Sequence, residues 1–340
     1  MLTQQAYIAV AGRQHRNCEP ICTPAATNHV AQILPHSVES GHLTAYVSFA
    51  YAVVKDCVPC HRQCHKKDLS PSQRILSGMD TLPNSQPSVV RISANGSHIT
   101  GFLICVDGFE EKTLLLTAQR GLFNSDNVLL DPSLIQVTMG AVDFRFNFET
   151  GRMTHILSKY VVYAKFFHRN PAYDIALLEI YPRVRWSPKI RPLCLPETPV
   201  QTMQHCYMYG YGSTMRIDSR PSSTLKYATL AILNQSVCLR HFQYNSRRLI
   251  CTSSIDAHRT PTNGDFGGPV LCAESDGGYF WYAPRGIITE QINTRGCLHI
   301  HTDVTAFKNW ISVAAGQLNS LPPNSRSKLG LNPFSFQLLN

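Results

Sequence analysis

The densest group of reactive side chains in the sequence lies near the N-terminus, in Cys57-Val-Pro-Cys60-His61-Arg-Gln-Cys64-His65. Three thiols and two imidazoles could bind zinc, and the C-x-x-C-H string matches the motif for covalent haem attachment. The chain, however, contains 12 cysteines in 340 residues, and an even, high count is typical of disulfides formed in an oxidising compartment. We therefore expect disulfides here, with neither a metal nor a cofactor, in a secreted, extracellular protein.

Two sequons and one hydrophobic stretch bear on secretion. Asn95 and Asn234 each begin an N-x-S sequence and are glycosylation acceptors by rule. Residues 43–54 form a hydrophobic run that contains an A-x-A pattern at 50–52, which signal peptidase accepts. Either residues 43–52 are a signal segment and the secreted chain starts later than Met1, or the run is buried in an N-terminal extension. At about a dozen residues it is too short for a membrane span, which needs about 20.

The formal net charge of +9 permits a polyanion partner, such as a glycosaminoglycan, or an acidic protein surface. Basic residues are densest at Arg183, Arg185, Lys189 and Arg191. A solvated basic face explains such a cluster more simply than a binding site does. The sequence contains no nucleic-acid-binding motif.

The elements that must position any site are short strands. Between residues 75 and 315, brief runs of alternating polar and apolar residues are separated by turn formers, as in 88–93, 135–139 and 225–233. This spacing predicts an all-β barrel or sandwich.

The two ends of the chain differ from this middle region. Residues 1–74 form a cysteine-containing N-terminal extension, and residues 316–340, without a clear period, are predicted to be a loosely ordered tail. Between them one helix is predicted, with Thr302 or Asp303 as its cap, because four apolar residues fall at helical spacing: Val304, Phe307, Trp310 and Ile311.

Gly264-Asp265-Phe266-Gly267-Gly268-Pro269 resembles the nucleophile loop of chymotrypsin- and trypsin-like serine proteases, in which a serine stands where this chain has Phe266. Four further blocks follow the family's order: 74–78 resembles the activation site, 115–120 the histidine block, 174–178 the aspartate block, and 190–196 the linker between two barrels. The resemblance implies two six-stranded antiparallel β-barrels with a C-terminal helix over residues 75–315.

The chain departs from this family at the residues that perform catalysis. The chemistry needs an oxygen nucleophile, an imidazole base and a carboxylate that orients the base. The resemblance puts Phe266 at the nucleophile, Gln119 at the base and Asp174 at the carboxylate, so only the last is retained. A phenyl ring has no proton to transfer and an amide does not titrate in the useful range, so we expect no peptide hydrolysis.

The substrate pocket implied by the resemblance has changed as well. Thr260, neutral and β-branched, occupies the position at the base of the pocket that sets specificity. Gln291 and His299 occupy positions at which the family has glycines. These side chains are expected to fill the pocket.

The resemblance also implies several disulfides. Cys206–Cys272 and Cys238–Cys251 match two bridges of the family, and Cys194 matches the cysteine that tethers the propeptide, here to one of the cysteines at 57–64. The bridge beside the histidine is lost, with Arg120 in place of one cysteine. The partners of the remaining six cysteines are not assigned: Cys18, Cys22, Cys105, Cys297 and the two cysteines at 57–64 that do not pair with Cys194.

Two carboxylates carry alternative interpretations. After cleavage following Arg74, the new amino group of Ile75 could pair with Asp265 and act as a conformational switch, or Asp265 could only cap a turn. Asp174 could be a relic, or a structural anchor that accepts a hydrogen bond from the Gln119 amide.

The resemblance therefore implies a secreted, non-catalytic serine protease homologue of the kind abundant in invertebrates. Such proteins act by binding, as cofactors or regulators in a proteolytic cascade, in immunity or in seminal fluid, and an active serine protease or another cascade component would be the partner. The alternatives are a polyanion-binding or adhesion module and a protease with rearranged catalytic machinery.

Overall fold

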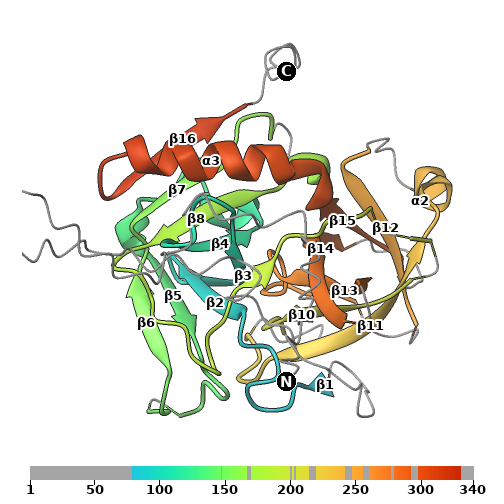
Figure 1. Cartoon of the computed structure of the whole chain (residues 1–340), viewed down its shortest axis with the longest axis horizontal. Coiled ribbons are helices and arrows are strands. Elements are labelled where there is room, and N and C mark those ends of the chain that lie inside the picture. The colour runs from blue at the N-terminus through green and yellow to red at the C-terminus, as the bar shows by residue number, and fades with distance from the viewer. Residues whose placement is uncertain are drawn as a thin grey trace, which may run out of the picture.

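The computed structural model describes residues 79–330 apart from 147, 167–169, 200, 203, 214–219, 242–246, 256–259, 277–278 and 292–297. The segment 43–52, the cysteine run 57–65 and the predicted cleavage site after Arg74 therefore lie outside the described residues. Two β-sheets lie side by side. The first consists mainly of strands between residues 89 and 194, and the second mainly of strands between residues 205 and 303. A C-terminal helix lies across the top of the first sheet in the view of Figure 1. Within the described ranges no helix is long and apolar enough to cross a membrane.

The second sheet closes into a six-stranded barrel, because β11 pairs with both β10 and β12. β1 pairs with the start of β11, and α2 connects β11 to β12. Apolar side chains fill the barrel, and Phe266 packs against them. The elements are β1 (Met79–Asp80), β10 (His205–Gly210), β11 (Lys226–Leu233), α2 (Gln235–His241), β12 (Leu249–Ser254), β13 (Pro269–Asp276), β14 (Tyr279–Gln291) and β15 (Leu298–Asp303).

The first sheet is a half-barrel with the strand order β7-β8-β4-β3-β2-β5-β6, and β9 pairs with β3. The first and last of these seven strands, β7 and β6, are separated in sequence only by Leu157 and Ser158, so one bent stretch of chain joins them. Its strands are β2 (Val89–Ala94), β3 (Ser97–Cys105), β4 (Thr113–Thr117), β5 (Ile135–Met139), β6 (Met153–Ile156), β7 (Lys159–Tyr163), β8 (Ala176–Ile180) and β9 (Leu193–Cys194). The predicted fold class is confirmed, with one barrel closed and the other open.

Three short 3₁₀ helices shape the loops of the first sheet: η1 (Gln119–Leu122), η2 (Pro132–Leu134) and η3 (Pro171–Tyr173). η1 begins two residues after β4, and η3 ends directly before Asp174. These two turns therefore position the segments that were expected to carry the family's base and carboxylate.

The predicted C-terminal helix is present as η4 (Thr305–Phe307) followed by α3 (Lys308–Ser320). Val304 directly precedes η4, and the Asp303 carboxylate one residue earlier accepts a hydrogen bond from the Thr305 amide (2.8 Å) in the first turn. Trp310 and Ile311 are buried in a core that residues of both sheets share.

The prediction of a loosely ordered tail from residue 316 is wrong for the described part. α3 continues to Ser320, and β16 (Ser325–Leu329) pairs in parallel with β7. The Trp310 indole donates a hydrogen bond to the Leu329 carbonyl (3.0 Å), which fixes the tail to the helix. This strand was missed because backbone pairing to the free edge of β7, rather than an apolar period, stabilises it.

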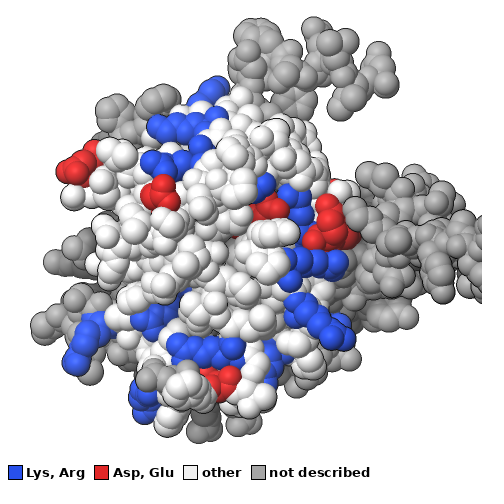
Figure 2. Space-filling model, turned by 90° about the vertical axis from the view of Figure 1, so that its left-hand side faces the viewer, with Lys and Arg blue, Asp and Glu red and all other residues white. Residues whose placement is uncertain are grey.

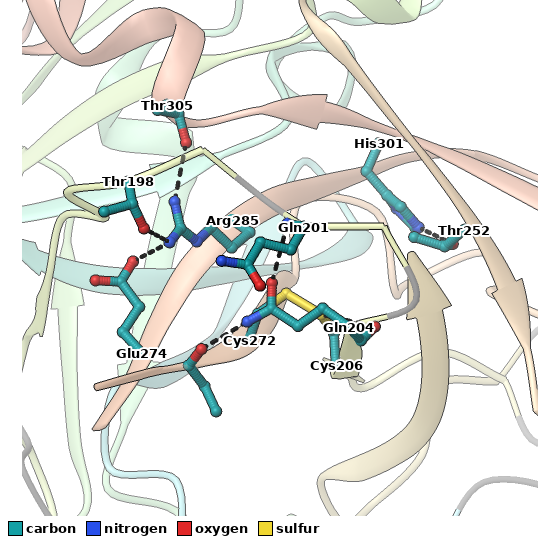
Figure 3. Close-up of a disulfide and its surroundings, with 11 residues drawn as sticks. Thr198, Gln201, Gln204, Cys206, Thr252, Cys272, Glu274, Arg285, His301 and Thr305 are labelled. Carbon is teal, nitrogen blue, oxygen red and sulfur yellow. Dashed lines mark hydrogen bonds and ion pairs between the residues drawn. A yellow bond between two sulfur atoms is a disulfide. The ribbon is translucent and has the colours of Figure 1, made fainter. Parts of the chain in front are cut away.

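A buried arginine fixes the linker between the sheets to the second barrel. Arg285 on β14 is 1% exposed and forms an ion pair with Glu274 on β13. Its Nη2 atom donates to the Thr198 hydroxyl of the linker (2.9 Å), close to the Cys206–Cys272 disulfide (Figure 3). A buried ion pair is stable only when its remaining hydrogen-bonding groups have partners. The hydrogen bond from Arg285 to Thr198 therefore helps to fix the position of the linker, in addition to apolar packing.

Candidate functional site

The loop that resembles a nucleophile loop, residues 262–268, leaves the second barrel and contacts the first sheet. The Thr100 amide on β3 donates to the Phe266 carbonyl (3.0 Å), and the Thr100 hydroxyl donates to the Gly264 carbonyl (2.7 Å). Gly267 has a φ of +87°, and a Cβ at this position would collide with Thr117 and with the Thr100 carbonyl. The loop conformation thus requires glycine at this contact between the sheets.

Asp174, the carboxylate retained from the family pattern, is fully buried and paired with Arg120. It accepts hydrogen bonds from the Arg120 amide (2.9 Å) and from Arg120 Nε. Burial raises the pKa of Asp174, and the charge and hydrogen bonds of Arg120 act in the opposite direction. Its burial and its pairing fit the structural-anchor interpretation, which stays a prediction.

The partner of Asp174 differs from the expected one. Gln119 Nε2 donates instead to the Tyr173 carbonyl (2.6 Å), and Gln119 Oε1 is buried without a hydrogen-bond partner among the described residues. The reason is the 3₁₀ turn η1, which aims the Arg120 side chain at Asp174 and the Gln119 side-chain amide at the carbonyl of Tyr173, the residue before Asp174. A charged donor next to a buried carboxylate also forms a stronger hydrogen bond than a neutral amide does.

Phe266 is partly buried, with its ring against the core of the second barrel. The Arg120 guanidinium lies over this ring at 5.4 Å from the centroid. Arg120 therefore connects two of the three expected catalytic positions, by an ion pair to Asp174 and a cation–π contact to Phe266. Sequence reasoning noted Arg120 only as the replacement of a cysteine, and its one usable signal was a basic residue directly after the expected base.

Asp265 is held by neighbours within the chain. Its carboxylate accepts hydrogen bonds from the amides of Gly212 (2.7 Å) and Thr262 (2.8 Å) and from the Thr262 hydroxyl (3.0 Å). It lies in a cradle between Gly210 and Gly212, where a Cβ on either glycine would collide with it. Burial raises the pKa of Asp265, while these hydrogen bonds lower it. This is the turn-capping arrangement, whereas Arg74 and Ile75 of the switch interpretation are not described.

The residues predicted to line a degenerate pocket lie on or beside adjacent strands of the second barrel. Gln291 on β14 and His299 on β15 are direct neighbours across the ladder. His299 is fully buried and its Nε2 atom lies 2.9 Å from the Ser254 hydroxyl. Thr260 is partly buried, and the Gln291 side chain is outside the described atoms.

A second histidine, which sequence reasoning missed, follows the same pattern. His301 is fully buried, two residues after His299 on the same strand, and its Nε2 atom lies 2.8 Å from the Thr252 hydroxyl. Burial, with the neighbouring His299 ring as a smaller cause, lowers the pKa of His301 well below its usual range. The barrel interior therefore contains two neighbouring histidine–hydroxyl pairs.

Cys206 and Cys272 form the disulfide that the resemblance implied, between directly opposed positions of β10 and β13. Cys105, Cys194 and Cys251 are also disulfide-bonded. Cys105 lies opposite Cys194 in the β3–β9 pairing. The side chain of Cys238, the partner predicted for Cys251, and the cysteines at 57–64 lie outside the described atoms.

Both predicted glycosylation acceptors are exposed on turns. Asn95 has a φ of +47° in the turn between β2 and β3. Asn234 precedes α2, and its side-chain oxygen accepts the Ser236 amide (2.9 Å), which leaves its nitrogen available for a glycan.

The residue types that meet at this site limit the chemistry of a Ser–His–Asp arrangement. Among the described residues that meet here, Gln119, Arg120, Asp174 and Phe266 supply neither a hydroxyl nucleophile nor an imidazole base. No group of three His, Cys, Asp or Glu side chains in the described ranges is placed to hold a metal ion.

Comparison with known proteins agrees with this architecture. The chain is 24% identical to cathepsin G of Mus musculus over 241 residues, which are 70% of this chain and 84% of that protein. It is 25% identical to transmembrane protease serine 11E of Mus musculus, over 76% of this chain and 58% of that protein. It is 26% identical to transmembrane protease serine 7 of Homo sapiens, over 61% of this chain but 24% of that protein.

A solved structure has the same fold. Human heparin binding protein superimposes with a TM-score of 0.58 at 22% identity, covering 73% of this chain and 99% of that one. The Trypsin family profile matches residues 75–311, which contain both sheets and the loop 262–268. Since this match spans well over half of its 340 residues, the chain belongs to the trypsin-like serine protease family.

Proposed function

We propose that this chain is a secreted, non-catalytic member of the family that acts by binding a protein partner. The observation that carries the proposal is Arg120, which is paired with the buried Asp174 and lies over Phe266. A cationic side chain thus contacts two of the three positions that the resemblance assigns to catalysis, and it directly follows the third, Gln119. Loss of the nucleophile or the base alone costs roughly a million-fold in kcat in a comparable triad.

The disulfide between Cys206 and Cys272 supports an oxidising, extracellular compartment. The family resemblance suggests the type of partner, an active serine protease or another component of a proteolytic cascade. Cofactor roles in immunity or seminal fluid fit a protein that keeps the protease fold without its chemistry.

A fluorophosphonate probe tests the absence of catalysis, with active trypsin as positive control. We expect no labelling of the unmodified protein or of Phe266→Ser, because Gln119 cannot accept the proton. The double variant Phe266→Ser, Gln119→His should show little labelling, because Arg120 still holds Asp174. The triple variant, which adds Arg120→Ala, should show more labelling than the double variant. Stoichiometric labelling of the unmodified protein, with peptide turnover, would refute the proposal.

The same probe tests a protease with rearranged machinery. Ser254 and His299 do form a Ser–His pair, at 2.9 Å. They are only 6% and 0% exposed, so we expect that a substrate carbonyl does not reach them. Labelling that disappears in Ser254→Ala would favour this alternative.

Polyanion binding is a second candidate function. It is favoured by the net charge of +9 and by the shared fold with a protein named for heparin binding. Salt-dependent retention on immobilised heparin tests it, because phosphate- and sulfate-like charges are screened by salt.

A further inference from the structure

The connection between β5 and β6 displays large apolar side chains to solvent. Phe148 is 95% exposed and Phe146 is 59% exposed. Met153 and Ile156 on β6 are also exposed, at 36% and 55%. Met153 and Ile156 are three residues apart on the strand, so they point to opposite faces of the sheet. We call Phe146 and Phe148, together with Arg145 and Arg152, the β6 face. Apolar groups gathered on one surface mark interaction sites, because water contact with them is unfavourable.

The loop that carries the two phenylalanines is held in place by hydrogen bonds. The Glu149 carboxylate accepts from the Val142 amide (3.1 Å) and the Asp143 amide (2.9 Å). Arg152 Nη1 donates to the Phe146 carbonyl (2.6 Å), and Lys189 Nζ donates to the Thr150 carbonyl (2.5 Å). The loop is therefore preorganised, which lowers the entropic cost of binding a partner.

Positive charge surrounds these apolar side chains. The guanidinium groups of Arg91 and Arg152 both lie over the Phe144 ring, 4.3 and 4.7 Å from its centroid. The Arg145 side chain is 70% exposed. Figure 2 shows the molecule from the side on which β5 and β6 lie, and blue side chains gather across the lower part of that surface with little red among them.

Two nearby carboxylates offset only part of this charge. Asp143 is paired with Arg145, and Glu149 is occupied by backbone amides. Arg91, Arg145, Arg152 and Lys189 thus face two internally engaged carboxylates, so the local balance is positive. Such a surface attracts anionic groups of a partner.

The backbone beside these side chains is open to pairing. β6 is the last strand of its sheet and pairs only with β5 among the described elements. A shallow hollow of about 430 Å³ runs beside it, lined by Phe148, Glu149, Thr150, Arg152 and Thr154. An edge strand offers its amides and carbonyls to an extended peptide.

We propose that the β6 face binds an extended, acidic segment of a partner protein. The apolar side chains of the segment pack on Phe146 and Phe148, and its carboxylates pair with Arg145 and Arg152. A glycosaminoglycan has no apolar side chains to cover two phenyl rings, and a second copy of this chain would bring a basic face against a basic face. The inference rests on the proposed binding function and specifies its site.

Fluorescence anisotropy of a labelled peptide made of three Glu-Phe-Asp-Leu repeats tests the proposal on the full chain. We expect binding that weakens with salt, and weaker binding when Lys replaces the acids or Ser replaces the apolar residues. Phe148→Ala and Arg145→Glu should each weaken binding about ten-fold, the range expected for a contact at the centre of an interface. Phe148 is exposed, so its substitution should not impair folding. Arg145→Glu leaves the buried Asp143 without its partner, so the melting temperature of this variant is measured beside its affinity, and Arg145→Gln, which adds no like charge, should weaken binding in the same direction.

Val313→Ala on α3 and Lys328→Ala on β16 are matched controls, because they remove an exposed apolar and an exposed basic side chain at the opposite end of the first sheet (Figure 1). Neither should change the affinity. No binding of the acidic peptide, or equal effects of control and β6-face variants, would overturn the proposal. Heparin binding that depends on Arg145 but not on Phe148 would also overturn it, in favour of a polyanion. None of these outcomes requires probe labelling, which tests the proposed function separately.

Discussion

Removal of Arg120 is the most informative perturbation, because it leaves Asp174 without its charged partner. Asp174 is 0% exposed and Arg120 is 16% exposed at the side chain, so water can compensate little for the loss. Breaking a buried ion pair by removing one partner costs about 3–5 kcal/mol. At about 2–4 °C per kcal/mol for a domain of this size, Arg120→Ala should lower the melting temperature by roughly 6–20 °C.

The size of this effect should depend on pH. Burial already raises the pKa of Asp174 above its unfolded value, and loss of the arginine charge raises it further. A carboxyl group with a raised folded-state pKa contributes stability that is present below its unfolded pKa and is lost as the pH rises through the folded pKa. The difference between Arg120→Ala and the unmodified protein should therefore be large at neutral pH and should shrink toward pH 4.

Differential scanning fluorimetry between pH 4 and pH 8 measures both quantities. Arg326→Ala is the matched control, since its pair with Asp131 is exposed (34% and 47%) and should contribute less than about 1 kcal/mol. Asp174→Asn should recover part of the stability lost in Arg120→Ala, because a neutral amide needs no counter-charge. A melting temperature within about 2 °C of the unmodified protein, or a deficit independent of pH, would refute the anchor role.

Three further predictions follow from buried groups of the second barrel. Reducing the Cys206–Cys272 bond, which closes a loop of 66 residues, should destabilise the protein by about 4 kcal/mol in chemical denaturation, whereas an unchanged midpoint would argue against a structural role. Cleavage after Arg74 should leave hydrogen exchange at residues 260–270 unchanged if Asp265 only caps its turn, and an effect abolished by Asp265→Asn would instead support the switch. Because burial lowers the pKa of His301, the contribution of this side chain to stability is present above pH 6.5 and is lost at lower pH. His301→Gln should therefore flatten the fall in melting temperature between pH 7 and pH 5. An identical pH profile of the variant and the unmodified protein would contradict this prediction.

The sequence determined the fold class and the identity of the residues at the site. Short alternating strands and five ordered blocks were enough to predict the family's β architecture, and the residue types alone predicted that Phe266 and Gln119 lack the chemistry of a nucleophile and a base. Asp303 was one of two predicted caps of the C-terminal helix. These conclusions depend on local pattern and on side-chain chemistry, both of which a linear sequence contains.

Tertiary structure decided which side chains meet. Gln119 and Arg120 are adjacent in sequence, and only the direction in which the 3₁₀ turn aims them determines that Arg120 rather than Gln119 reaches Asp174, 54 residues away. β16 exists because the edge of β7 was free to pair with it, and His301 is buried because the barrel closes around it. The aromatic side chains at 146 and 148 look like core residues in the sequence, and only the fold shows that they face solvent. Each of these outcomes depends on contacts between distant segments, whose geometry local propensity does not encode.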